Sequence, residues 1–185
     1  RDSLPAVTGE LRLREVGVRH GPAELLSHTG GTIAFTNERV ASPALAGNLF
    51  GAPFTASFDV EDLADPRVAF SARGTAELEQ ILALMEGEEP VQATGRLPFD
   101  LQGRLVASNP LASVVEGTIG IGGLRAELPS LLQPVQLSSG TMRFAGERLL
   151  LEDVALAFGE SRVRATATVN DWLPVALGDS AAVAQ

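Results

Sequence analysis

Apolar residues alternate with polar ones along most of the chain. In the longest run, residues 91–107, every second residue is apolar or Gly, and only Pro98 and Val106 interrupt the polar positions between them. A period of two places successive side chains on opposite faces of a β-strand. The run is longer than an ordinary strand of about five or six residues. We therefore expect two strands or one unusually long strand, with an edge, bulge or break at Pro98, which lacks a backbone N–H.

Shorter runs of the same kind predict further strands. They cover residues 54–60, 68–73 and 162–169, with shorter pieces at 33–35 and 142–144, and Gly, Pro, Asn and Asp separate them. These four residue types are the usual turn formers. The chain is therefore expected to be all-β and mainly antiparallel.

One segment, residues 76–85, predicts a short helix. Its apolar residues have the i, i+3, i+4, i+7 spacing of one helix face: Leu78, Ile81, Leu82 and Met85. Thr75 is the expected N-cap, acidic Glu77 lies in the first turn, and Gly87 follows as a stop. We expect this helix to cover one end of the sheet.

The chain also resembles itself at a shift of 108 to 109 residues. Residues 31–40 align with 140–149, and residues 54–62 align with 163–171. The alternation slips by one position in 11–18 and again in 119–126, which predicts a bulge or bend near Glu15 and another near Gly122 and Gly123. A shared irregularity favours duplication and a repeat architecture.

The predicted organisation is thus a single segment, residues 1–178, made of two repeats of about 108 residues. The first repeat covers about 9–108 and the second, incomplete repeat covers about 117–178. Residues 179–185 carry no turn or cap signal and are expected to be a tail. We interpret the chain as an excerpt of a longer protein.

Composition excludes several classes of function. The net charge of −9 and the lack of any basic cluster make nucleic acid an unfavourable partner. There is no Cys, which removes disulfides, thiolate nucleophiles and Cys-based metal sites. No apolar run approaches the ~20 residues that span a bilayer as a helix.

Candidate catalytic and metal-binding chemistry is sparse. His20 and His28 are expected in loops as solvated residues, since no third metal ligand stands nearby. The group of Glu86, Glu88 and Glu89 is interpreted as a solvated turn, since nothing supplies the other ligands of a calcium site. We therefore expect no catalytic residues, no metal and no cofactor, although paired carboxylates of a glycosidase could be brought together by a fold.

Glycine motifs and paired acidic residues have structural interpretations too. Residues 159–163 lack the second Gly of a nucleophile elbow and are expected to form a turn between strands. The Gly-rich stretch 117–123 precedes no capped helix that could receive a phosphate, so we expect bulges or close backbone approach there. The pairs 61–62 and 170–171 occupy equivalent turns, and one member changes from Glu to Asn.

The apolar faces of the strands are the remaining candidate site. They could be the buried core of an ordinary closed sandwich, and periodicity alone does not exclude this. They could instead line a long groove. The candidate lining residues are Phe54, Phe58, Val60, Phe70, Leu97, Phe99, Leu101, Leu105, Ile119, Ile121, Phe144, Val163 and Val169.

The order of these elements resembles that of the AsmA-like family. The resemblance lies in a G-x-(aliphatic)-x-F strand, a turn flanked by a basic residue, an aliphatic strand, then G-x-P or G-x-S and another alternating strand. These are residues 31–35 with 51–53, and residues 140–144 with 159–161. The helix after 70–72 and the run 95–105 also fit, so the resemblance covers nearly the whole chain.

This resemblance implies a fold and a function. The implied fold is a curved, elongated antiparallel sheet that forms an open trough with an apolar interior. The implied function is a non-catalytic lipid-binding or lipid-transfer scaffold in outer-membrane lipid homeostasis, with phospholipid acyl chains as partners. The implied location is the periplasm of a diderm bacterium. Such proteins are tethered to the inner membrane by an N-terminal helix, and contacts with the inner and outer membranes would come from parts of the chain not present here. The alternative is a closed sandwich with a structural or adhesive role and no lipid ligand.

Overall fold

The computed structural model describes residues 6–21, 23–84, 92–127 and 133–176. Its strands are β1 (Thr8–His20), β2 (Ala23–Thr36), β3 (Arg39–Leu49), β4 (Ala52–Glu61), β5 (Arg67–Glu77), β6 (Gln92–Thr94), β7 (Arg96–Val106), β8 (Val114–Gly120), β9 (Leu124–Glu127), β10 (Val135–Ala145), β11 (Arg148–Phe158) and β12 (Ser161–Asn170). The helices are α1 (Leu78–Leu82), the 3₁₀ turn η1 (Pro110–Ala112) and α2 (Trp172–Ala176). The all-β prediction is confirmed.

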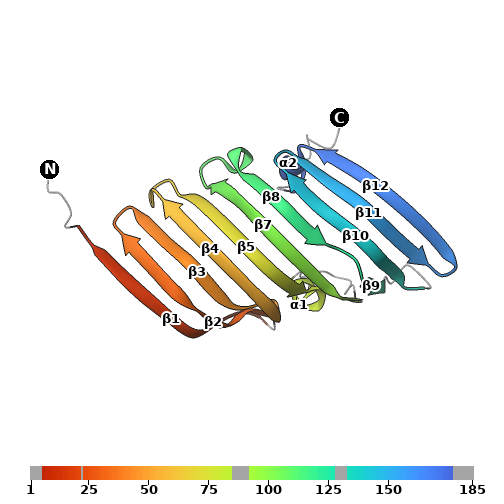
Figure 1. Cartoon of the computed structure of the whole chain (residues 1–185), viewed down its shortest axis with the longest axis horizontal. Helices are drawn as coiled ribbons and strands as arrows, with labels where there is room; N and C mark the ends of the chain where they lie inside the picture. Colours follow the sequence, from red (N-terminus) through yellow and green to blue (C-terminus); the bar gives the residue numbers. More distant parts are fainter. Residues whose placement is uncertain (1–5, 22, 85–91, 128–132, 177–185) are drawn as a thin grey trace.

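All twelve strands belong to one open antiparallel sheet. The main path runs β1-β2-β3-β4-β5-β7-β8-β10-β11-β12, so nearly every strand pairs with the next strand along the chain (Figure 1). The short strands β6 and β9 pair with each other, and β9 also pairs with β10. The described strands do not form the two facing sheets of a closed sandwich.

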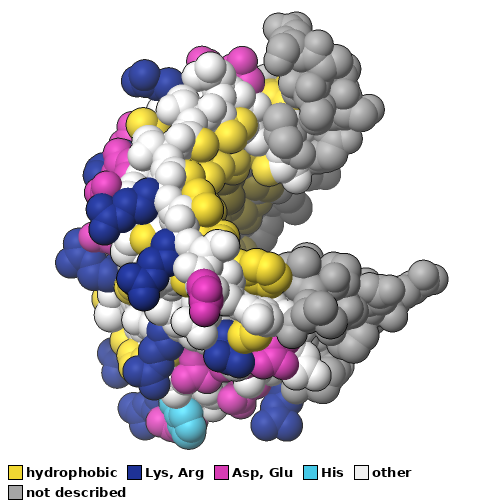
Figure 2. All heavy atoms as spheres, turned by 90° about the vertical axis from the view of Figure 1, so that its right-hand side faces the viewer, with side chains coloured by type: hydrophobic (Ala, Val, Ile, Leu, Met, Phe, Trp, Pro, Cys, Tyr) yellow, Lys and Arg dark blue, Asp and Glu magenta, His cyan; other side chains and the backbone are white. Residues whose placement is uncertain are grey.

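Viewed along its long axis, the sheet has a C-shaped outline (Figure 2). Hydrophobic side chains line the hollow of the C, and Arg, Asp and Glu side chains cover its outer surface. The trough therefore runs across the strands, and each strand bends around it. This is the curved, elongated sheet that the sequence predicted.

Bulges in the middle of the strands produce this bend. Pairing shifts register in β1 between Leu13 and Val16, and in β3 between Ser42 and Leu45. A bulge adds an unpaired residue and bends the strand that carries it. The shift in β1 contains Glu15 and confirms the bulge predicted there.

The irregularities recur at the spacing of the sequence repeat. The β3 bulge between Ser42 and Leu45 has its counterpart in β11, between Leu151 and Val154. In four pairs of positions 108 or 109 residues apart, both residues have a positive backbone φ: 15 and 123, 31 and 140, 50 and 159, and 62 and 171. Strands β1 to β4 are thus matched by β8 with β9, β10, β11 and β12. The exact repeat boundaries stay a prediction.

The second predicted irregularity takes another form. Strand β8 ends at Gly120 and β9 begins at Leu124, and both pair with β10 in the same register. The chain therefore breaks its strand around Gly122 and Gly123 without adding a residue. Gly123 has φ +76°, a backbone conformation that glycine adopts without steric cost.

The long alternating run breaks at a different residue from the one we predicted. It forms two strands, β6 and β7, but they separate at Gly95, which has φ +136°. Pro98 lies inside β7, where it is opposite Thr75. A side chain at Gly95 would approach Leu124 within 2.6 Å, so close packing and backbone conformation place the break at the glycine.

The prediction of one helix from 76 to 85 was wrong in extent and number. Strand β5 continues to Glu77, and Thr75 and Ala76 pair with β7. Helix α1 therefore starts at Leu78, without a side-chain cap, because ladder pairing outweighs the capping preference of Thr75. Met85, Gly87, Glu86, Glu88 and Glu89 lie outside the described residues, and α2 was not predicted.

Helix α1 lies across one end of the sheet, as expected (Figure 1). It contacts β2, β5 and β6, and backbone hydrogen bonds from Glu77 N to Phe50 O and from Leu78 N to Gly95 O hold its start. The buried apolar residues among those described lie near this end: Ala52, Phe54, Ala76 and Ala93. The sheet thus has a small local core at one rim and is otherwise open.

Candidate apolar groove

The register of the strands aligns apolar side chains into rows that cross the sheet. Residues directly opposite each other in neighbouring strands share a face. One row runs from β4 to β12 through Phe54, Gly74, Phe99, Ile119, Met142, Leu151 and Ala167. The next runs from β3 to β12 through Leu45, Ala56, Ala72, Leu101, Gly117, Phe144, Leu149 and Val169. Each row is apolar or Gly throughout, so the floor of the trough is continuous.

Two further rows extend this floor toward the hairpin turns between β4 and β5. Phe58 lies opposite Phe70, and Val60 lies opposite Val68, which in turn lies opposite Leu105. Phe58 and Phe70 are half-buried, and Leu105 is 42 % exposed. Large apolar side chains are therefore accessible on the concave side.

All thirteen predicted lining residues lie on this one face, but they do not offer the same surface. Phe54 is only 8 % exposed and packs over Gly74, so it supports the floor. Val163, on the edge strand β12, is 55 % exposed. Ile121 follows the end of β8, and its side chain occupies the space above Gly140. The other predicted residues are half-buried or lie at the edge of the rows.

Sequence reasoning missed several residues of the floor. Leu45 escaped because the bulge at Pro43 and Ala44 changes the phase of alternation within β3. Leu149 and Leu151 escaped because Leu150, between them, is also apolar. Matching β11 to β3 at the repeat spacing does not identify Leu151, because it aligns with the polar residue Ser42.

Small residues allow the strands of the floor to approach closely. A Cβ on Gly117 would lie 2.0 Å from the carbonyl oxygen of Asp100, and one on Gly103 would lie 2.2 Å from that of Val114. The expectation of close backbone approach in the Gly-rich stretch is thus confirmed at Gly117. Phe70 and Phe144 lie opposite Gly103 and Gly117, so each ring has space on the neighbouring strand.

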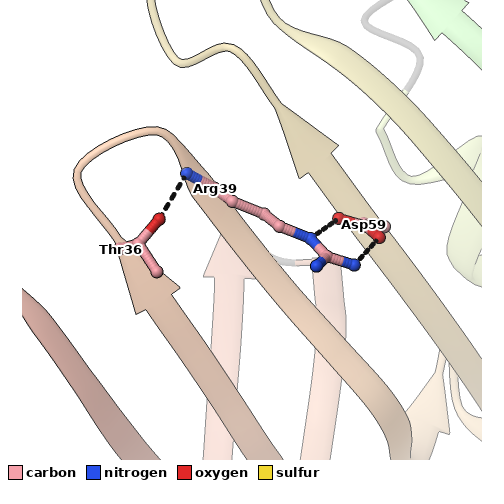
Figure 3. Close-up of polar contacts among 3 residues, drawn as sticks. All are labelled: Thr36, Arg39 and Asp59. Carbon is pink, nitrogen blue, oxygen red and sulfur yellow. Dashed lines mark hydrogen bonds and ion pairs between the residues drawn. The ribbon is translucent and has the colours of Figure 1, made fainter.

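The convex face carries ion pairs and polar contacts instead. Arg39 binds Asp59 across β3 and β4 through two hydrogen bonds, with Nε donating to Oδ1 at 2.7 Å (Figure 3). Arg73 donates to Asp100 at 2.6 Å, and Arg143 donates to Glu152 at 2.9 Å. Polar cross-strand pairs of this kind keep the outer face hydrated.

Two ion pairs, Arg39 with Asp59 and Arg143 with Glu152, shift the pKa values of their members. The hydrogen bond from Arg39 lowers the pKa of Asp59, and that from Arg143 lowers the pKa of Glu152. The same bonds raise the pKa of both guanidinium groups. Both carboxylates therefore stay ionised as partners of arginine, which is a structural role.

The histidines lie in strands rather than in the loops that we predicted. His20 ends β1, and His28 lies in β2 at a register shift, with φ +50°. The Nδ1 atom of His28 lies 2.7 Å from Oε2 of Glu15, and this hydrogen bond raises the pKa of the imidazole. Both side chains are exposed, and among the described residues no group of three or more His, Asp or Glu could hold a metal ion.

The acidic and glycine turns have the predicted structural roles. Oδ1 of Asp62 accepts hydrogen bonds from the backbone N–H of Ala64 and Asp65 at 3.2 and 3.3 Å. Gly159 and Glu160 form the two-residue turn between β11 and β12. A shallow hollow of about 450 Å³ beside Pro43 has a partly polar lining that includes residues of the convex face, so the apolar trough remains the candidate site.

Comparison with known proteins gave no match to any family model, curated protein or solved structure. Within the described residues, no helix has the length and hydrophobicity needed to cross a bilayer. A functional argument for this chain therefore starts from the geometry of the trough.

Proposed function

We propose that this chain binds the acyl chains of phospholipids in its trough and acts as a non-catalytic scaffold for lipid transfer. The observation that carries the proposal is a continuous, exposed apolar face on the inside of a curved sheet, opposite a charged outer face (Figure 2). Soluble proteins rarely leave a large apolar surface open unless it binds something. The AsmA-like resemblance supports the same role, in the periplasm of a diderm bacterium.

The energetics favour acyl chains as the ligand. Each CH₂ group moved from water to an apolar surface gains about 0.8 kcal/mol. The eight strands joined by the longer row, β3 to β12, are spaced by about 4.8 Å and give a floor of roughly 34 Å. One leaflet of a bilayer has a hydrocarbon depth of about 15 Å, half of the ~30 Å core. The floor is therefore long enough to hold a whole acyl chain and to let it move along the rows.

The lining suits a mobile ligand. Aliphatic side chains and a few Phe rings contact a lipid chain without directional hydrogen bonds, so one position along the trough resembles the next. Charges held on the convex face do not compete with this contact. The proposed role requires no catalytic residue and no cofactor.

A pair of neighbouring substitutions on β4 tests the proposal. Phe58→Asp places a carboxylate on the floor, whereas Ser57→Asp places the same group on the convex face, one residue away. We expect the unchanged chain and Ser57→Asp to bind a dioleoyl phosphatidylethanolamine in native mass spectrometry. Phe58→Asp should bind it at least about tenfold more weakly, which corresponds to about 1.4 kcal/mol.

Circular dichroism would establish that each variant is folded, and Leu101→Asp provides a second floor position if Phe58→Asp unfolds. If the unchanged, folded chain binds no phospholipid, the proposal is wrong, and a structural or adhesive role of the sheet becomes the better account. Equal binding by the folded floor and convex variants would place the lipid elsewhere.

A further inference from the structure

Each of the two rims of the trough carries a short helix. Helix α1 lies at one end of the strands, and α2 lies at the opposite end, after β12 (Figure 1). Helix α1 covers the small local core of the sheet. The contacts of α2 show that it lies beside the accessible part of the floor.

Trp172, the first residue of α2, attaches this helix to the concave side. Its ring contacts the ring of Phe144 edge to face, with 5.0 Å between the ring centroids. Its indole N–H donates to the carbonyl oxygen of Gly146 at 2.9 Å, and its backbone N–H donates to that of Glu147 at 3.4 Å. Because Phe144 is a residue of the floor, Trp172 stands over the floor at the rim where β10 turns into β11.

The hydrogen bond to Gly146 gives the Trp172 ring an apolar outer surface. A buried indole usually needs a partner for its N–H, and here a backbone carbonyl supplies that partner. Trp172 and Phe144 are both half-buried, so each keeps part of its ring accessible beside the trough. A large aromatic ring that needs no further polar partner is a suitable contact surface for an acyl chain.

The first repeat carries an aliphatic residue where the second has Trp172. Phe35 is the counterpart of Phe144 at a shift of 109 residues, and each of the two lies opposite a glycine of the preceding strand. The counterpart of Trp172 is Leu63, which follows β4 and is 44 % exposed. The strands of the first repeat form without an aromatic residue at this rim. Trp172 therefore adds a surface to a framework that does not require it.

We propose that Trp172 forms a wall of the trough and contacts the acyl chains of bound phospholipid directly. This inference rests on the proposed function and adds to it a residue that lies outside the sheet. The wall stands beyond Phe144, the last concave position of β10, and limits how far a lipid chain moves toward this rim. A chain beside it is shielded from water by the floor and by the wall, and each further CH₂ group that is buried favours binding.

Fluorescence tests this contact, because Trp172 is the only tryptophan of the chain. Bromine atoms quench indole fluorescence at short range. The probe is phosphatidylethanolamine with brominated stearoyl chains, added to the unchanged chain, and the same lipid without bromine is the reference. We expect the brominated lipid to reduce the fluorescence of Trp172 as it binds. Both lipids should shift the emission to shorter wavelength, because water leaves the surface of the ring.

Two double variants move the single fluorophore to β4 and provide matched controls. Trp172→Phe with Phe58→Trp places it on the floor, and Trp172→Phe with Ser57→Trp places it on the convex face, one residue away. The brominated lipid should quench the first variant and spare the second. Circular dichroism establishes that both are folded, and native mass spectrometry measures lipid binding in the same preparations.

Quenching of Trp172 supports the proposal, and its absence overturns it. If Trp172 is not quenched but the floor variant is, the lipid binds in the trough away from α2, and only this inference fails. If neither is quenched, the trough proposal fails as well. Equal quenching of the convex variant would overturn both, because it would show lipid attached over the whole surface.

Discussion

Single residues decide how closely the strands of this sheet pack. Gly117 shows this most clearly, because its φ is +127° and a Cβ would lie 2.0 Å from the carbonyl oxygen of Asp100. Gly146 also has a positive φ, +62°, but nothing lies within 4 Å of the position of its Cβ. Substituting both glycines and comparing the results therefore separates the energetic cost of a positive φ from that of a steric clash.

We expect Gly117→Ala to lower the free energy of unfolding by about 2–5 kcal/mol, from backbone strain and overpacking together. Gly146→Ala should lower it by about 1–2 kcal/mol, because only the strain of a positive φ applies. Urea denaturation followed by circular dichroism measures both. An equal decrease in the free energy of unfolding for the two variants would show that the close approach at Gly117 does not contribute to stability.

The pair of Arg39 and Asp59 makes stability depend on acidity. Because Arg39 lowers the pKa of Asp59 in the folded state, the carboxylate binds protons less readily there than in the unfolded chain. The stabilisation that this ion pair provides is complete above the pKa of about 3.9 that an Asp has in the unfolded chain. It is lost as the pH falls through the lower pKa of Asp59 in the folded state.

Asp59→Asn should therefore destabilise the protein at pH 7, and the difference from the unchanged chain should shrink as the pH falls below 4. Thermal unfolding across this range gives the measurement, and Ser57→Asn, on the same face of β4, controls for the amide. A difference between Asp59→Asn and the unchanged chain that is constant down to pH 2 would contradict a role for the ion pair.

At the scale of elements, alternation in the sequence was sufficient to predict most strands. Residues 54–60, 68–73 and 162–169 form parts of β4, β5 and β12. Where the prediction failed, pairing across strands outweighed a local signal. Thr75 is a good N-cap residue, but it lies in β5 opposite Pro98 of β7. Pro98 could break a strand, but it lies within the stretch where β5 pairs with β7.

The bulges were harder to predict than the strands. The bulge at Glu15 could be predicted because the alternation of apolar and polar residues is clear both before and after it. The apolar positions simply resume one residue later. The bulge in β11 could not, because 149–151 are all Leu and hide the change of phase. The repeat spacing does not supply the missing information, because the equivalent bulge in β3 was not predicted from the sequence either.

Asp153 tests whether the β11 bulge is set by backbone geometry. It is exposed and has φ +50°, a conformation that Gly adopts readily and a β-branched residue does not. Asp153→Gly should stabilise the protein by up to about 1 kcal/mol, and Asp153→Val should destabilise it by about 1–2 kcal/mol. Denaturant unfolding compares them. A valine variant as stable as the glycine variant would show that this bulge tolerates another conformation.

At the scale of the whole molecule, the sequence predicted an apolar face but left open whether that face was a closed core or an open groove. Alternation places Phe58 and Leu101 on one side of their strands, and this holds equally for a sandwich and for a trough. The distinction depends on where the strands turn and what faces them, which no single strand specifies. The open, C-shaped sheet resolves that question of shape (Figure 2).

The proposed function rests on shape and surface together. A trough of aliphatic side chains with arginine and carboxylate pairs outside is suited to hold a lipid chain from one side and to remain in water on the other.

The measurement that tests the central claim most directly is photocrosslinking of a phospholipid with a diazirine in its acyl chain, mapped by mass spectrometry of peptides. We predict that crosslinks fall on concave residues such as Phe58, Leu101 and Phe144, at several positions along the trough, and spare their convex neighbours Ser57, Gln102 and Arg143. Crosslinks spread equally over both faces, or confined to the convex face, would contradict the account.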